Sequence, residues 1–135
     1  MNLHSSEFTF QVETKHDPTK ALVAVVKAAH AAGWVVVGDY ELSGLVTESA
    51  SGWDLKSVDI CLPELARPFV SAQPLTALCM PCSILIFSDG SKTTLAAMRP
   101  GVLMPHLFAE AADAAGEIAT RIDRELQQIL EAAKG

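Results

Sequence analysis

One short segment of this chain is apolar on both of its alternating sides, and it constrains the fold more than any other. Residues 83–87 read Ser-Ile-Leu-Ile-Phe, a composition typical of a β-strand. Asp89-Gly90 follows as a turn signal, and residues 93–98 resume a strand pattern. A strand that is apolar on both sides needs cover on both faces of its sheet. We therefore expect helices on one face and a second copy of the chain on the other.

The remaining patterns give the order of the elements. Residues 7–13 alternate between polar and apolar, which indicates a strand with one buried face. Asp17-Pro18 is typical of a helix start, and Gly33 of the end of that helix. Further expected elements are a strand over residues 34–46, a turn over residues 47–52, a strand over residues 55–62, an ambiguous short helix over residues 64–76, a break of the fifth strand at Pro100-Gly101 and one long helix over residues 109–133.

This order is β-α-β-β-β-β-α. It predicts an α+β two-layer sandwich with a mostly antiparallel five-stranded sheet and helices on one face. No repeat, linker or low-complexity tract divides residues 1–135, so we expect a single domain.

Composition excludes several classes of partner. Half of the 135 residues are hydrophobic and the net charge is −6, which favours neither nucleic acid nor an anionic membrane surface. The sequence contains neither an apolar run of about 18 residues nor the apolar core of a signal peptide. Three cysteines are a poor disulfide framework, so we expect reduced thiols and a cytoplasmic location.

Sulfur-bearing residues gather at one end of the predicted sheet. Cys61 closes the third strand, while Cys79 and Cys82 precede the fourth. Antiparallel pairing brings these strand ends together, and Met98 at the end of the fifth strand reaches the same edge. The residues expected to crowd this edge are Cys61, Cys79, Cys82, Met98, Met104 and His106.

The register of the hairpin decides which residue lies opposite Cys82. A two-residue turn at Asp89-Gly90 pairs Cys82 with Ala97, whereas a change of one residue in the loop pairs it with Met98. Both alternatives remain open from the sequence.

Thiol and thioether groups prefer copper(I), zinc or haem iron to hard cations. The candidate ligand- or metal-binding residues are Cys61, Cys79, Cys82, Met98 and His106. We therefore expect a non-enzymatic binding module that holds a soft metal, a haem or a small ligand at this edge. Glycine-rich phosphate loops and the common hydrolase motifs are absent, so no catalytic residue is predicted.

Two alternatives compete with a binding module. The first is a thiol redox protein, because Cys79-Met80-Pro81-Cys82 is similar to a thioredoxin motif. A strand pattern follows this motif, however, and not the helix whose N-terminus would activate a thiol. The second is a structural homodimer in which cysteine and methionine only fill the core, as both residue types commonly do.

Three local patterns carry a family resemblance. They are Cys61-Leu62-Pro63, Leu78-Cys79-Met80-Pro81-Cys82 and Ala97-Met98-Arg99-Pro100. They are similar to the Cys-Asn-Pro, Leu-Leu-Pro-Cys and Ala-Met-Asp-Pro patterns of the Domain of Unknown Function 302 family, which the chain resembles over roughly residues 8–133. The resemblance implies an α/β sandwich of TATA-box-binding-protein-like topology, usually dimeric, with no established activity. Cys61, Cys82 and Met98 fit the family pattern, while Cys79 and Arg99 stand where leucine and aspartate are common.

Overall fold

The computed structural model describes residues 3–48 and 52–135 of the chain. Five antiparallel strands form one sheet in the order β1-β5-β4-β3-β2. The strands are β1 (Thr9–Thr14), β2 (Val35–Glu41), β3 (Asp54–Cys61), β4 (Cys82–Ser88) and β5 (Thr93–Met98). The helices are α1 (Ser5–Phe8), α2 (Pro18–Ala31), α3 (Pro63–Ala72), the 3-10 helix η1 (Pro74–Cys79), α4 (Pro100–Leu107), α5 (Ala109–Ala115) and α6 (Ile118–Ala133). The predicted α+β class and sheet are confirmed.

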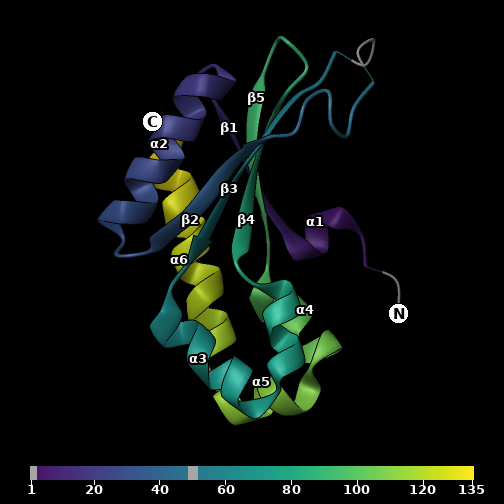
Figure 1. The fold of residues 1–135 in the computed structure, drawn as a ribbon, viewed down its shortest axis with the longest axis vertical. Coiled ribbons are helices and arrows are strands. Elements are labelled where there is room, and N and C mark those ends of the chain that lie inside the picture. Colours follow the sequence, from purple (N-terminus) through teal and green to yellow (C-terminus); the bar gives the residue numbers. More distant parts are fainter. Residues whose placement is uncertain (1–2, 49–51) are drawn as a thin grey trace.

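Two long helices cover one face of the sheet (Figure 1). Helix α2 contacts β3 and β4, and α6 contacts β1 and β5. Between them lie fully buried side chains such as Ile84 and Ile86 of β4, Val25 of α2 and Leu126 of α6. Each buried aliphatic side chain of this size stabilises the fold by roughly 1.5–3 kcal/mol. The core between sheet and helices therefore lies on this face, and it continues past the end of the sheet among α3, α4 and α5.

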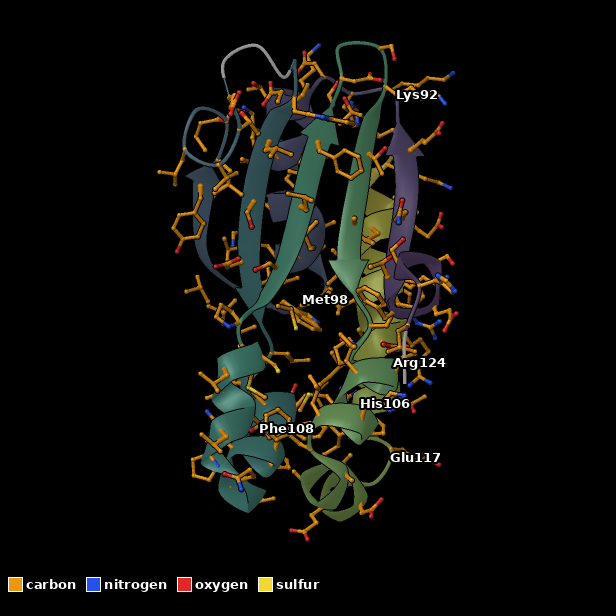
Figure 2. The ribbon with its side chains drawn as sticks, turned by 90° about the vertical axis from the view of Figure 1, so that its right-hand side faces the viewer. Lys92, Met98, His106, Phe108, Glu117 and Arg124 are labelled. Atoms are coloured by element: carbon orange, nitrogen blue, oxygen red, sulfur yellow. The ribbon has the colours of Figure 1, made fainter. Side chains whose placement is uncertain are left out.

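The opposite face of the central strands carries no helix within the described residues (Figure 2). Leu85 and Phe87 of β4 point to this open face and are only partly buried. Trp53 packs on Phe87, with the ring centroids 5.7 Å apart. Trp53 is 45% exposed and Tyr40 is 47% exposed. A cluster of apolar side chains thus remains on an uncovered sheet face.

The start of α2 agrees with the sequence. The Asp17 side chain accepts a hydrogen bond of 2.8 Å from the backbone amide of Lys20, and Pro18 takes the first helical position. Gly33, just after the helix, adopts a φ of +81°, which few other residues tolerate. Strand β2 ends earlier than predicted, at Glu41. The predicted turn over residues 47–52 lies partly outside the described residues.

The hairpin between β4 and β5 is longer than predicted. Ser88 pairs with Thr93 and Ile84 with Ala97, so four residues form the loop. Both predicted pairings of Cys82 were therefore wrong. The amides of Ser91 and Lys92 donate hydrogen bonds to the side chain of Asp89, at 2.9 and 3.3 Å. These bonds stabilise a wider loop in which only Gly90 needs a positive φ.

The C-terminal third contains more helices than predicted. The expected long helix is two helices, α5 and α6, because Gly116 between them has a φ of +63°. Pro100-Gly101 ends the fifth strand as expected, but it also begins the unpredicted helix α4. The ambiguous segment forms α3, which runs through Pro68. No helix in the described part of the chain has both the length and the apolar character to cross a membrane.

A buried carboxylate on α6 holds the start of α4. One oxygen of Asp123 accepts hydrogen bonds from Nε and Nη2 of Arg99, at 3.1 and 3.0 Å. The other oxygen accepts a bond of 2.9 Å from the backbone amide of Gly101. The Arg99 guanidinium also stacks 4.6 Å from the centre of the Phe10 ring. A Cβ atom at position 101 would lie 2.9 Å from the Asp123 carboxylate, so only glycine fits there.

We predict that Asp123→Ala destabilises the protein by roughly 2–3 kcal/mol. The substitution leaves Arg99 and the amide of Gly101 without their partner. The loss of stability is smaller than for a fully buried ion pair, because the Arg99 side chain is 34% exposed. Urea denaturation measures it, with Arg124→Ala as control because Arg124 is an exposed neighbour on the same helix. Equal midpoints for the two variants would contradict the role of Asp123.

Candidate functional site

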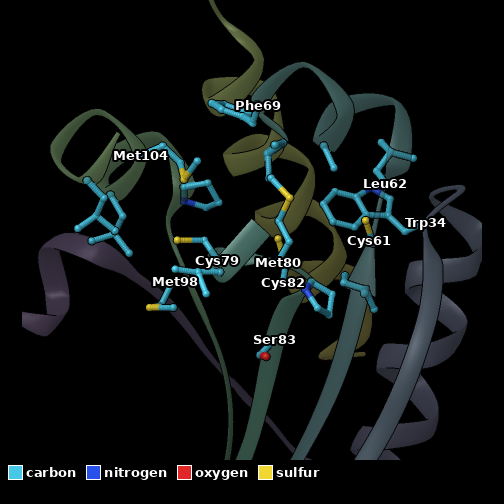
Figure 3. A pocket seen from close by; sticks show the side chains of 18 of the residues that line it. Trp34, Cys61, Leu62, Phe69, Cys79, Met80, Cys82, Ser83, Met98 and Met104 are labelled. Carbon is cyan, nitrogen blue, oxygen red and sulfur yellow. The ribbon is translucent and has the colours of Figure 1, made fainter. Parts of the chain in front are cut away.

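A cavity of about 390 Å³ lies at the end of the sheet where α3, η1 and α4 begin or end (Figure 3). Its lining combines aromatic, aliphatic and sulfur-bearing side chains with the hydroxyl of Ser83. The lining residues are Phe8, Trp34, Ile60, Cys61, Leu62, Ala66, Phe69, Leu78, Cys79, Met80, Pro81, Cys82, Ser83, Met98, Pro100, Leu103, Met104, Leu107 and Ile122. None of these side chains is charged. The Trp34 indole N–H points away to Glu125, to which it donates a bond of 3.0 Å.

Prolines shape this end of the molecule. Pro63 begins α3 immediately after β3, Pro74 begins η1, and Pro100 begins α4 after β5. Proline favours the first turn of a helix because it lacks a backbone N–H that the helix could not use there. The chain therefore turns from strand into helix beyond the sheet edge, and the helices enclose space that the sheet does not fill.

Sulfur atoms are concentrated in this cavity. The structure brings together four of the five predicted site residues, Cys61, Cys79, Cys82 and Met98. Met104 lines the cavity as well, as does Met80, which the sequence did not single out (Figure 3). The fifth predicted residue, His106, does not line it. It lies exposed on α4 (Figure 2).

The described residues contain no group of three or more His, Cys, Asp or Glu side chains placed to hold a metal ion. A zinc site built from such ligands is therefore not assembled in this part of the chain. The soft donors lining the cavity are the thiols of Cys61, Cys79 and Cys82 and the thioethers of Met80, Met98 and Met104. These atoms could contact copper(I) or haem iron, but equally well the surface of an organic ligand.

Burial of Cys61 and Cys82 favours the neutral form of their thiols. Burial, with added repulsion from Cys61, Cys79 and Asp59, raises the pKa of the Cys82 thiol to about 12. Burial also raises the pKa of Cys61. Cys82 begins a strand, so no helix N-terminus stabilises its thiolate. The thiol of Cys82 is thus protonated at neutral pH, which does not favour dithiol chemistry.

The mouth of the cavity opens toward the uncovered face of the sheet. Ile84 and Ala97 point into the core, so their neighbours Ser83 and Met98 project from the opposite, open face. Both also line the cavity, together with Cys82 on the core side. The cavity is therefore lined by residues from both faces of the sheet at this end.

Large apolar side chains surround this mouth. Leu78 of η1 is 82% exposed, Leu107 of α4 is 57% exposed and Met98 of β5 is 56% exposed, and all three line the cavity. Exposed apolar groups that are continuous with an apolar cavity commonly mark a binding site. Sequence reasoning missed this part, because α4 was not expected. The sequence signal that could have placed α4 is Pro100 after the fifth strand, since proline favours the first turn of a helix.

The fold and the cavity define an α+β sandwich domain with an apolar, sulfur-lined cavity beyond the end of its sheet. A family model described as "Domain of unknown function DUF302" matches residues 10–133, and the chain belongs to this family. The structure is similar to the crystal structure of an uncharacterized conserved DUF302 protein from Bacillus stearothermophilus. The TM-score is 0.79 at 16% identity, over 93% of this chain and 98% of that one. At this identity the likeness concerns the fold. A comparison with curated proteins gave no match.

We predict that alkylation of Cys82 by iodoacetamide in the folded protein accelerates with pH up to at least pH 10. The physical reason is its pKa of about 12, which keeps the thiolate scarce over this range. In protein unfolded by urea, the alkylation rate of the same cysteine should level off once the pH passes an ordinary thiol pKa of roughly 8.5. Mass spectrometry of the tryptic peptides gives both rate profiles. A plateau near pH 8 in the folded protein would contradict a buried, neutral thiol.

Proposed function

We propose that this protein is a non-enzymatic binding module that holds a small ligand with an apolar body in the sulfur-lined cavity. The observation that carries this proposal is the uncharged lining of a cavity of about 390 Å³. Ligand sites commonly occupy about 300–1,000 Å³ and are mostly apolar. A ligand that fills such a space removes its own apolar surface and that of the cavity lining from water.

The sulfur-bearing side chains suit an organic ligand. Methionine is flexible and polarizable, so Met80, Met98 and Met104 can adapt their shape to a guest and contact aromatic rings favourably. The neutral thiol of Cys82 and the half-buried Cys61 add small apolar contacts. A soft metal or haem is the less supported version, because a buried thiol with a pKa of about 12 must lose its proton to bind a metal.

The expected affinity is modest for a simple probe. A body of naphthalene size that loses about 200 Å² of apolar surface gains roughly 5 kcal/mol. This gain alone corresponds to a dissociation constant of roughly 0.2 mM, before entropy costs and additional contacts. Binding of such a probe is therefore measurable by titration calorimetry.

We predict that 1-naphthalenemethanol binds the protein with a dissociation constant of roughly 0.1–1 mM, and that Ala66→Phe weakens binding at least tenfold. Ala66 lines the cavity, so a phenyl ring at this position occupies the space of the ligand. Ala72→Phe is the matched control, since Ala72 is exposed on the same helix and does not line the cavity. Absence of binding to the wild type, or equal binding to both variants, would overturn the proposal.

We propose in addition that the chain forms a homodimer through the open face of its sheet, in the cytoplasm, where thiols stay reduced. The supporting observation is the apolar cluster of Leu85, Phe87, Trp53 and Tyr40 on this face. A sheet face of this character is usually covered in solution.

We predict a dimer mass for the wild type in light scattering at about 50 μM, and a monomer mass for Leu85→Glu. The substitution introduces a carboxylate, and thus a pair of like charges, at the centre of a two-fold interface. Gln127→Glu on α6 is the control, because it adds the same charge at an exposed position of the helix layer, away from the open sheet face. A monomeric wild type would rule this interface out.

A further inference from the structure

We infer that the ligand of the cavity carries an organic ammonium group at its outer end, and that Asp59 and Ser83 receive this group at the mouth. The inference rests on the proposed binding function. The inference adds the chemical class of the ligand, which is an amine with an apolar body. Its evidence is the placement of one carboxylate beside an otherwise uncharged cavity.

Asp59 does not line the cavity itself, but it lies next to Ser83, which does. It pairs with Ser83 across β3 and β4, and the Ser83 hydroxyl donates a bond of 2.6 Å to its Oδ1 atom. The Ser57 hydroxyl approaches the same oxygen at 3.4 Å. Within the described residues, Oδ2 of Asp59 has neither a hydrogen bond nor an ion pair. This carboxylate therefore retains acceptor capacity toward an incoming donor.

The negative charge of Asp59 has no cationic partner in the described part of the chain. Arg99, which follows β5, is held by two bonds to Asp123 and does not line the cavity. The field of Asp59 reaches the cavity, since it contributes to the raised pKa of the Cys82 thiol. A carboxylate without a counter-ion beside an apolar cavity attracts a cation, and the net charge of −6 acts in the same direction.

The mouth also offers suitable acceptors. An ammonium group has three N–H donors, and the oxygens of Asp59 and Ser83 can accept two of them while the third remains in water. The apolar body then extends past Met98 and Cys82 into the cavity. Hydrogen bonds to a charged group contribute more than neutral ones, so the amine should bind more tightly than an alcohol of the same shape.

One feature near the cavity favours an anionic ligand instead of a cationic one. Helix α3 begins at Pro63 next to the lining residue Leu62, which provides no side-chain cap. The positive end of a helix corresponds to about half an elementary charge, whereas Asp59 carries a full one. We therefore assign the cation preference to this site, and the test includes an anionic probe.

The experiment compares three probes with one apolar body, 1-naphthylmethylamine, 1-naphthalenemethanol and 1-naphthylacetic acid, by titration calorimetry at pH 7. We expect the amine to bind the wild type at least fivefold more tightly than the alcohol, and the acid most weakly. Asp59→Asn should remove the advantage of the amine over the alcohol. Asp39→Asn is the control, an exposed carboxylate of the neighbouring strand that does not contact Ser83.

Several results would overturn this inference. They are equal affinity for the three probes, tightest binding of the acid, or an Asp59→Asn variant that keeps the advantage of the amine. If the alcohol still binds in these cases, the cavity keeps its proposed function and only the ligand class is wrong. If none of the three probes binds, both proposals fail together.

Discussion

The position of helix α4 depends on a single buried carboxylate. Asp123 reaches from α6 to both Arg99 and the amide of Gly101, and thereby ties α4 to the strand that precedes it and to the helix that packs on the sheet. Leu103, Met104 and Leu107 of α4 form one wall of the cavity. Without this tie, the same apolar side chains could collapse onto the end of the sheet and fill the space. The cavity is thus a consequence of polar bonds that keep the apolar helix α4 away from the end of the sheet.

Much of the fold follows from the sequence because alternation and helix starts are local signals. The five strands and the Asp17 cap depend only on neighbouring residues. The register of the hairpin does not, since Asp89 stabilises a four-residue loop through its side chain. The helix break at Gly116 and the helix start at Pro100 were missed for a similar reason. Glycine and proline mark boundaries, but the tertiary structure decides whether a helix ends, restarts or begins there.

The sulfur cluster was the part of the site accessible from the sequence. Antiparallel pairing alone brings Cys61, Cys82 and Met98 to one end of the sheet, whatever the exact register. Much of the apolar remainder of the lining was not accessible, because it comes from helices whose placement is tertiary, and the placement of α4 depends on the buried bonds of Asp123. The structure changes the meaning of the cluster accordingly. The Cys82 thiol, first considered as a metal ligand or redox centre, lies among apolar groups and holds its proton.

The most direct test of the central claim is a methyl NMR spectrum of the protein labelled with ¹³C at its methionine methyl groups, recorded with and without 1-naphthalenemethanol. Met80, Met98 and Met104 line the cavity, so their signals report on its occupation. Assignment follows from single Met→Leu variants. If the ligand occupies the cavity, all three signals shift and saturate at the same ligand concentration. Binding of the ligand without any change in these three signals would contradict it.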